Sequence, residues 1–472
     1  MHRQKAFNTF RQTYPRFDFE GFSYDVQPDG LHIVFSFSAV DSTSRHAIAF
    51  HPSAYIPTRD FLHFDQPRPT LDALVFHIGM VELVSYWKCF CPPKVHIRCG
   101  SLDASQISFW KKLYWHGLGE FFYTNGITTS YDDFMSITSQ GTRHALAQES
   151  SSTSPRPACL LPVGGGKDSV VSLGLLQQAG RPFVPLILNP RGATTACASV
   201  AGCGTEQTLV IQRTLDPTML RLNTQGCLNG HTPFSALLAG YTLLAAQLSG
   251  FHDIVLSNEN SANESTVLGT MVNHQYSKSL EFEMDFRNYV CHTFEGRYNY
   301  FSLLRPLNEL QIALLFASST AYHDVFRSCN VGSKQDVWCG HCAKCLFTYI
   351  ILSPFISPQR LEQIFGRDLF SDSEMISLLH ELLGMAESKP FECVGTVEEV
   401  AAAISLACHR WYSAVDRPPI LQHLHHLPSV DTALQILDSV SDNHCVPQDL
   451  LDALEKRRRS LNVEFIRSLS LS

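Results

Sequence analysis

The segment with the clearest chemical signal joins a short apolar run to a helical pattern. It consists of Gly164, Gly165, Gly166, Lys167, Asp168 and Ser169. Because glycine has no Cβ, the backbone amides of such a segment can approach an anion closely and adopt positive φ. The helix expected to begin near Asp168 adds unpaired N–H groups and the positive end of its dipole. These features predict a phosphate-binding loop. The alternative is a tight strand–helix turn whose glycines serve packing only.

The spacing of this loop excludes two common nucleotide motifs. A Walker A loop requires G-x-x-x-x-G-K-[ST], and the dinucleotide fingerprint requires G-x-G-x-x-G. Neither pattern fits the residues around Gly164. Asn189, which ends the next apolar run, completes the set of residues that we expect to bind the nucleotide.

A second polar cluster follows a later apolar run, "HDIVL". Within 256–266, two carboxylates, Glu259 and Glu264, stand among the amides Asn258, Asn260 and Asn263. Loops at such positions often carry function. The carboxylates could complete a Mg²⁺ site and the amides could orient a substrate, whereas the alternative is a polar turn with self-capping side chains.

The stretch just beyond this cluster, 273–283, is also rich in groups that can transfer protons. It supplies His274, Tyr276, Lys278, Glu281 and Glu283. An amphipathic surface helix would have a similar composition, so this stretch yields candidates rather than a defined site.

Four cysteines near residue 340 have the spacing of a metal site. Cys329, Cys339, Cys342 and Cys345 form a C-x₉-C-x₂-C-x₂-C array. Four thiolates at such spacings can enclose a tetrahedral zinc ion. A [4Fe–4S] cluster usually has a further Cys three residues on, followed by Pro, and that residue is absent here. Four small buried thiols without metal are the other alternative.

The elements around these motifs alternate between apolar strands and helices. This alternation over 158–354 predicts an α/β domain with a parallel sheet covered on both faces. In such sheets ligands bind outside the carboxyl ends of the strands. Residues 1–142 read as a small α+β domain, 143–157 as a Ser/Thr/Pro-rich linker, and 355–472 as a helical region.

Composition limits the range of possible partners. The net charge of −8 disfavours a broad nucleic-acid-binding surface. The uncharged run 222–251 contains too many polar residues for a membrane span and reads as a buried helix, and the N-terminus lacks the apolar segment of a signal peptide. Fifteen cysteines without a secretion signal indicate reduced thiols and a cytoplasmic location.

The glycine loop resembles the pyrophosphate-binding loop, S-G-G-x-D-S, of the adenine nucleotide α-hydrolase-like ATP pyrophosphatases. The resemblance implies a Rossmann-like sheet and cleavage of ATP to AMP and pyrophosphate. It further implies that the glycines and Ser169 hold the pyrophosphate part, that Lys167 neutralises its charge, and that Asp168 helps to hold Mg²⁺. From its position after the later strand, we expect Glu259 to complete the Mg²⁺ site. Gly164 departs from the pattern, because the family usually has Ser or Thr there.

Further motifs narrow this resemblance. They are N-E-N-S-A-N-E, Y-S-K-S-L-E-F-E and W-C-G-H-C-x-K-C-x-F. Together with the glycine loop they resemble the UDP-N-acetyl-α-muramoyl-L-alanyl-L-glutamate epimerases, the MurL family, over about 158–355 and again at 389–400. The cysteine array itself also resembles the zinc site of 7-deazaguanine synthases.

The MurL resemblance implies that ATP and Mg²⁺ drive inversion of the terminal L-Glu of a UDP-N-acetylmuramoyl dipeptide to D-Glu. Removing a Cα proton beside an ionised carboxylate would place charge on charge, and adenylation of that carboxylate removes the obstacle. We expect the catalytic residues to be Asp168, Glu259, Glu264, Lys278 and Cys393. For the proton transfer itself, Lys389, His274 and Glu283 are further candidates. A ligase that forms a nitrogen product, or a non-catalytic ATP-binding module, is the alternative function.

Overall fold

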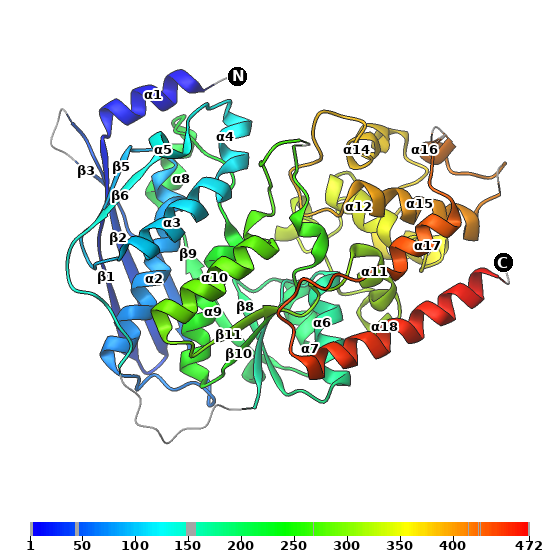
Figure 1. Cartoon of the computed structure of the whole chain (residues 1–472), viewed down its shortest axis with the longest axis horizontal. Coiled ribbons are helices and arrows are strands. Elements are labelled where there is room, and N and C mark those ends of the chain that lie inside the picture. The colour runs from blue at the N-terminus through cyan, green and yellow to red at the C-terminus, as the bar shows by residue number, and fades with distance from the viewer. Residues whose placement is uncertain are drawn as a thin grey trace.

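The computed structural model describes residues 3–42, 47–147, 157–267, 269–413, 415–422, 424 and 426–470. Most of the predicted linker, 148–156, lies outside these residues. The described chain is a mixed α/β structure with one large sheet and many helices, so the predicted fold class is confirmed at this level (Figure 1). The division into four segments remains a prediction.

Eleven strands of the described residues form a single sheet, in the order β11-β10-β7-β8-β9-β4-β2-β1-β5-β6 with β3 beside β2. The N-terminal strands are β1 (Arg16–Gln27), β2 (Gly30–Val40), β3 (Ala47–Phe50), β4 (Ser53–Pro57), β5 (Lys94–Ile97) and β6 (Ser136–Ser139). The remaining strands are β7 (Cys159–Pro162), β8 (Phe183–Leu188), β9 (Leu209–Thr214), β10 (Asp253–Leu256) and β11 (Asn299–Ser302), and these five run parallel.

The sheet continues across the predicted boundary at residue 142. Strand β4 of the N-terminal part pairs antiparallel with β9, with Ala54 opposite Arg213. Within the N-terminal part, β2 pairs antiparallel with both β1 and β3. The two predicted regions therefore share one hydrogen-bonded sheet.

Helices cover both faces of this sheet. Those of the N-terminal part are α1 (Gln4–Thr13), α2 (Arg68–Trp87), α3 (Ala104–Gly117), α4 (Gly119–Asn125) and α5 (Tyr131–Phe134). The parallel part carries α6 (Lys167–Gln178), α7 (Gly192–Val200), α8 (Pro217–Thr224), α9 (Phe234–Ser249), α10 (Leu280–Phe294) and α11 (Glu309–Ala317). Figure 1 shows α2, α3, α9 and α10 side by side over one face.

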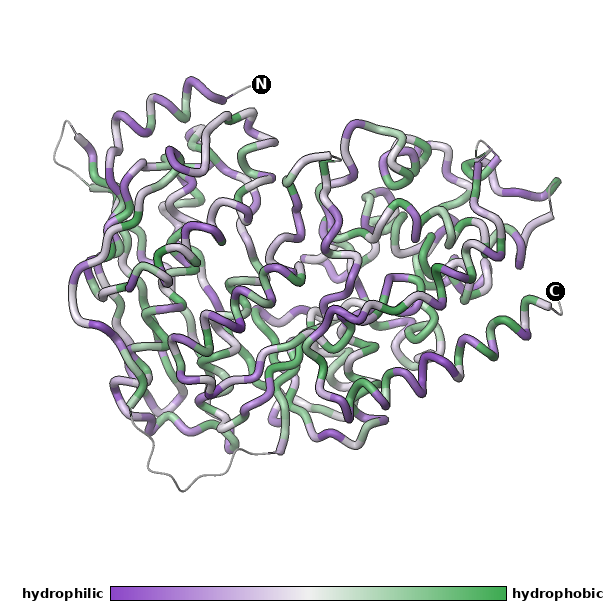
Figure 2. Tube along the Cα trace, viewed as in Figure 1, coloured by the Kyte–Doolittle hydropathy of each residue, from purple (hydrophilic) through white to green (hydrophobic). Residues whose placement is uncertain are grey.

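Helices dominate the chain after β11 and α11, including residues 355–470, for which the sequence predicts a helical region. This part of the chain contains α12 (Ala343–Leu352), α13 (Pro358–Phe365), α14 (Ile376–Leu382), α15 (Val397–Trp411), α16 (Pro419–Gln422), α17 (Val430–Asp438) and α18 (Gln448–Leu469). Figure 2 shows hydrophobic residues along the strands and hydrophilic residues along α1 and α18. Among the described residues, no helix is long and apolar enough to cross a membrane.

Alternate residues of the parallel strands enter two different cores. Leu160 and Leu186 join a core that includes α2 and α9, whereas Leu161 and Ile187 join a core formed with α6, α11 and α12. Successive side chains of a strand point to opposite faces, so a strand buried on both sides reads as a continuous apolar run. This explains why the strands were recognisable from sequence.

A buried ion pair ties the N-terminal helix α2 to the parallel strand β9. Arg213 donates from Nε and Nη2 to the two carboxylate oxygens of Glu82, each at 2.6 Å. Tyr241 of α9 donates its hydroxyl to Glu82 at 3.1 Å. Burial by itself would lower the pKa of Arg213, but the Glu82 carboxylate raises it, so the guanidinium stays charged.

This pair gives a first prediction. Glu82→Ala should lower the free energy of unfolding by about 3–5 kcal/mol, because the Arg213 charge would stay buried without a partner. The matched control is Glu281→Ala, which removes a carboxylate that is 52% exposed beside Lys112 and should cost no more than about 1 kcal/mol. Urea unfolding of both variants measures the difference, and equal losses would contradict a linking role for Glu82.

Candidate active site

The glycine loop connects the end of β7 to the start of α6. Gly165 has φ +79°, and a Cβ there would lie 2.9 Å from the backbone of Ala193 and Thr194, so this position requires glycine. Around Gly164 a Cβ would meet nothing within 4 Å. Among the described residues, no acceptor receives the N–H groups of Gly164, Gly165 or Gly166. The loop therefore offers free backbone donors at a helix N-terminus, as an anion site requires.

A cavity of about 540 Å³ opens beside this loop. The carboxyl ends of β7, β8 and β10 border it through Pro162, Leu188 and Leu256. The chain leaves β7 toward β8 on one side, while β10 lies on the other, so the strand order reverses here. Ligands of open α/β sheets bind at such a switch point.

The predicted site residues divide into two groups around this cavity. Those that line it are Gly164, Gly166, Asp168, Ser169, Asn189, Lys278, Cys329 and Cys393. Gly165, Lys167, Glu259 and Glu264 do not line it. The cavity wall also carries residues that the sequence did not single out, among them Arg327, Lys344 and His231.

Lys167, which we expected to neutralise the charge of a bound pyrophosphate, contacts two carboxylates of the chain instead. Its ammonium contacts the carboxylates of Asp168 and Glu309, and the side chains of Lys167 and Glu309 are each only 2% exposed. Burial alone would lower the pKa of Lys167, but the two carboxylates raise it. Lys167 therefore neutralises charges of its own chain and does not face the cavity.

Asp168 keeps a negative charge beside the loop. Burial by itself would raise its pKa, but the ammonium groups of Lys167, Lys344 and Lys278 lower it. Burial raises the pKa of Glu309, which opposes the effect of Lys167. A compact cluster of one cation between two carboxylates thus lies where the loop ends and α6 begins.

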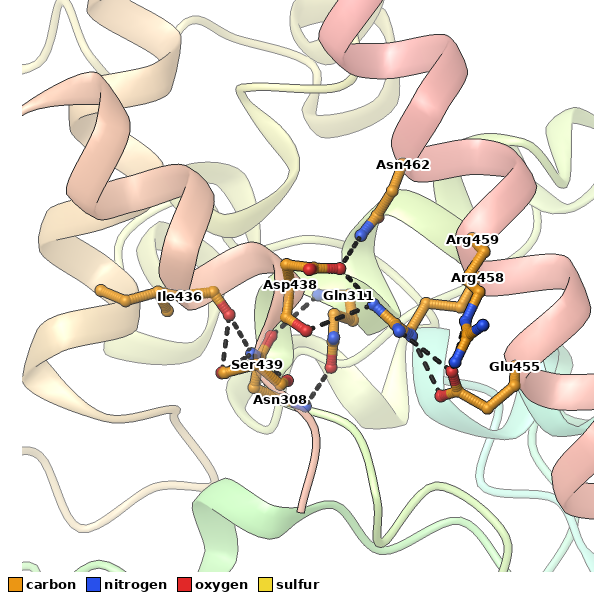
Figure 3. Close-up of polar contacts among 9 residues, drawn as sticks. All are labelled: Asn308, Gln311, Ile436, Asp438, Ser439, Glu455, Arg458, Arg459 and Asn462. Atoms are coloured by element: carbon orange, nitrogen blue, oxygen red, sulfur yellow. Dashed lines mark hydrogen bonds and ion pairs between the residues drawn. The ribbon is translucent and has the colours of Figure 1, made fainter. Parts of the chain in front are cut away.

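A polar network surrounds Asn308 at the start of α11, the residue directly before Glu309 (Figure 3). Asn308 caps this helix by accepting the Gln311 N–H at 3.0 Å, and it donates to the Ile436 carbonyl at 2.6 Å. In Figure 3 the adjoining Asp438 accepts hydrogen bonds from Arg458 and Asn462 of α18. The C-terminal helices therefore anchor the element that carries Glu309.

Two predicted catalytic carboxylates, those of Glu259 and Glu264, do not line the cavity. Glu259 is buried, and among the described residues its Oε2 has no hydrogen-bond partner. Glu264 pairs with Lys389, a candidate for proton transfer, so the two charges neutralise each other. A third candidate, Glu283, accepts hydrogen bonds from the buried Arg305 at 3.1 and 2.9 Å.

Cys393 lines the cavity and lies among positive charges. Lys278 and His274 are within hydrogen-bonding contact of its thiol, and Lys344 donates to its carbonyl. Burial by itself would raise the pKa of Cys393, but Lys278, His274 and Lys344 lower it to about 6. The structure thus brings together two predicted catalytic residues, Cys393 and Lys278.

His274 connects this group to the N-terminal part of the chain. Its Nδ1 donates to Glu120 Oε2 at 2.5 Å, and His231 Nδ1 lies 3.5 Å from the same oxygen. The sequence did not identify Glu120 or His231, which lie more than 40 residues from His274 and share no motif with it. The ligand atoms of all three lie within 4.8 Å of one another, but the charge of Lys88 beside His231 opposes a bound cation.

The four cysteines of the array converge. Their Sγ atoms are 3.8 Å apart for Cys329 and Cys342, 3.7 Å for Cys339 and Cys345, and 3.6 Å for Cys342 and Cys345. Sulfur atoms about 2.3 Å from a tetrahedral zinc ion are about 3.8 Å apart. The donor set therefore fits zinc in both chemistry and spacing.

Comparison with known proteins shows the family to which the chain is related. Residues 8–303 match the family model of the MurL N-terminal domain, and residues 325–432 match that of the MurL C-terminal domain. The chain belongs to the MurL family. The first MurL domain spans both halves of the sheet described above.

Curated MurL relatives cover most of the chain. A UDP-N-acetyl-alpha-D-muramoyl-L-alanyl-L-glutamate epimerase of Xanthomonas oryzae pv. oryzae is 36% identical over 384 residues, 79% of this chain and 83% of the relative. An epimerase of the same name from Salinispora tropica is 32% identical over 396 residues, 83% of this chain and 84% of the relative.

The glycine loop gives a second prediction, with a matched control in the same loop. Gly165→Ala should lower the free energy of unfolding by about 1–3 kcal/mol, because alanine would be strained at positive φ and its Cβ would meet backbone atoms. Gly164→Ala should change it by less than about 0.5 kcal/mol, since that Cβ enters open space. Thermal unfolding compares the two, and an equal effect would contradict the loop conformation.

Proposed function

We propose that this chain is an ATP-dependent epimerase that converts the terminal L-Glu of UDP-N-acetylmuramoyl-L-alanyl-L-glutamate to D-Glu. The names of its MurL relatives support the substrate and the reaction. The observation that carries the proposal is that the glycine loop and Cys393 line one cavity. A nucleotide site and a group able to move a proton thus lie within reach of one substrate.

A Rossmann-like fold of the ATP pyrophosphatase type is part of this proposal. Counted from β7, the parallel strands have the order 3-2-1-4-5, which is the order of doubly wound nucleotide-binding sheets. The cavity lies at the reversal of this order, where such folds bind nucleotides. The proposal also includes a cytoplasmic location, where ATP and UDP-linked precursors are available, and no nucleic-acid partner.

ATP would supply the activation that the reaction needs. A positioned base alone contributes about 10²–10⁴-fold, too little to form a carbanion beside an ionised carboxylate. Transfer of AMP to the α-carboxylate removes that charge and makes the carbonyl an electron sink. Pyrophosphate leaves, and hydrolysis of the adenylate after inversion returns the free carboxylate.

The chain offers suitable groups for Mg·ATP. The free N–H groups of Gly164, Gly165 and Gly166 fit a pyrophosphate anion. Asp168, on the cavity wall, is the first carboxylate that would hold Mg²⁺. The second would be Glu259, which does not line the cavity but has a buried Oε2 without a hydrogen-bond partner among the described residues. Bound Mg²⁺ would neutralise phosphate charge during transfer.

Cys393 is the residue that we assign to removal of the Cα proton. Inversion also requires that a proton return to the opposite face of Cα, from a second acid or after movement of the first. A thiolate is a base, and the ammonium of Lys278 stabilises it before the Cα proton is taken. Lys278, Lys344 and Arg327 also give the cavity wall positive charge that complements the carboxylates and phosphates of the substrates. Glu264 is paired with Lys389 and has no part in this assignment.

The third prediction tests the reaction. With UDP-N-acetylmuramoyl-L-alanyl-L-glutamate, ATP and Mg²⁺ in D₂O, the enzyme should place deuterium at Cα of the glutamate, and only when ATP is present. Mass spectrometry of the hydrolysed dipeptide and chromatography of the nucleotides measure both products, which should include AMP and pyrophosphate. Cys393→Ser should lower exchange about 10²–10⁴-fold while pyrophosphate still forms.

Three outcomes would contradict this function. Deuterium at Cα without ATP would overturn activation by adenylation. Formation of ADP would overturn the pyrophosphatase-type site. Pyrophosphate release without exchange, stimulated by a nitrogen donor, would identify a ligase instead.

The fourth prediction concerns the cysteine array, which we propose holds a structural zinc ion. Elemental analysis should find about one zinc per chain, and Cys342→Ser should remove it and lower the melting temperature. Cys291→Ser, at an exposed cysteine outside the array, is the control and should retain metal and stability. A wild-type protein that is metal-free and equally stable would contradict the zinc site.

A further inference from the structure

We propose that Glu120, in the N-terminal part of the chain, is a positioning residue of the active site that orients His274 against Cys393 and so activates the thiol. This inference rests on the proposed function for the role of Cys393 in proton transfer. It gives a catalytic task to a region for which sequence and family resemblance suggested none.

The geometry places the three side chains in series. Glu120 belongs to α4, and its Oε2 accepts the hydrogen bond from His274 Nδ1 at 2.5 Å. Since Nδ1 is occupied in this way, the other ring nitrogen, Nε2, is the one left to contact the Cys393 thiol. The Glu120 and His274 side chains are 15% and 13% exposed, so solvent competes weakly with their hydrogen bond.

A carboxylate, an imidazole and a thiol in this order form the arrangement by which enzymes activate a nucleophile or a base. A carboxylate fixes the tautomer and orientation of an imidazole and stabilises its charged form, and the imidazolium in turn stabilises a thiolate. Burial by itself would lower the pKa of His274, but hydrogen bonds to Cys393 and Glu120 raise it to about 9.

His231 shows that Glu120 discriminates between two imidazoles. The centroids of the His231 and His274 rings are 4.4 Å apart. At this distance two protonated imidazoles would repel each other, so protonation of one disfavours protonation of the other. Burial and the charges of His274 and Lys88 lower the pKa of His231 to about 3, so it stays neutral. The shorter contact with Glu120 belongs to His274, the ring that touches Cys393.

The pKa values of Cys393 and His274 determine the pH range in which the thiolate–imidazolium pair exists. Cys393 ionises as the pH rises through about 6, and His274 loses its proton as the pH rises through about 9. The thiolate–imidazolium pair therefore exists between these values. Lys278 and Lys344 also face Cys393 and favour the thiolate, whereas the neighbouring Glu392 opposes it. Loss of Glu120 should therefore weaken the thiolate without abolishing it.

The fifth prediction uses iodoacetamide, which alkylates thiolates, on the intact protein between pH 5 and 9. Alkylation of each cysteine is followed by mass spectrometry of its peptide, with the exposed Cys291 as internal reference. Glu120→Gln should raise the alkylation midpoint of Cys393 by about one pH unit, which corresponds to about a fivefold lower rate near pH 6 and about a tenfold lower rate near pH 5. Cys291 should be unaffected.

Three further variants separate the effect of the Glu120 carboxylate on Cys393 from a general loss of negative charge or a folding defect. Glu281→Gln removes a carboxylate that is 52% exposed and pairs with Lys112, and it should leave the Cys393 profile unchanged. Glu120→Asp retains the charge and should restore part of the shift. If Glu120→Gln fails to fold, His274→Gln should produce the same shift, because it removes the imidazolium directly.

A Cys393 profile that stays at the wild-type midpoint in both Glu120→Gln and His274→Gln would overturn the proposal. Alkylation needs neither ATP nor the dipeptide, so this outcome is distinct from failure of the proposed function. In the enzyme assay, Glu120→Gln should lower kcat more than it changes KM and should shift the acid limb of the pH profile upward. An effect on KM alone would indicate a structural role and also overturn the proposal.

Discussion

The architecture of the site depends on the buried contact of Lys167 with Asp168 and Glu309. A buried ammonium with two carboxylates is stable only while all three stay in place, since the loss of one partner leaves an uncompensated charge. Glu309 begins α11, whose cap at Asn308 is held by the segment before α18. The C-terminal helices thereby fix the start of α6 and, with it, the open glycine loop.

The continuous sheet also shapes the site, because it brings parts of the chain that are distant in sequence close to one cavity. Pairing of β4 with β9 and the bond between Arg213 and Glu82 hold the N-terminal part against the parallel strands. In this arrangement Glu120 of α4 meets His274, which lines the cavity. Residues from both halves of the sheet therefore meet beside the cavity.

Sequence patterns predicted the glycine loop, the parallel strands and the cysteine array well, since each is encoded by neighbouring residues. They were less informative for individual side chains. Lys167 turned inward to Glu309, a partner 142 residues away, and Glu264 paired with Lys389. A charged residue near a ligand site can serve the ligand or another residue of the chain, and sequence spacing does not distinguish these possibilities.

The sequence by itself determined where the backbone is bare, where strands alternate with helices and where four thiols can meet, because glycine geometry, apolar periodicity and cysteine spacing act locally. Only the tertiary structure decided which ionisable groups face the cavity. Whether Cys393 is a thiolate depends on Lys278, His274 and Lys344, and His274 depends in turn on Glu120. Charges act through space and over a few ångströms, so their effect is set by packing between segments that the sequence leaves far apart.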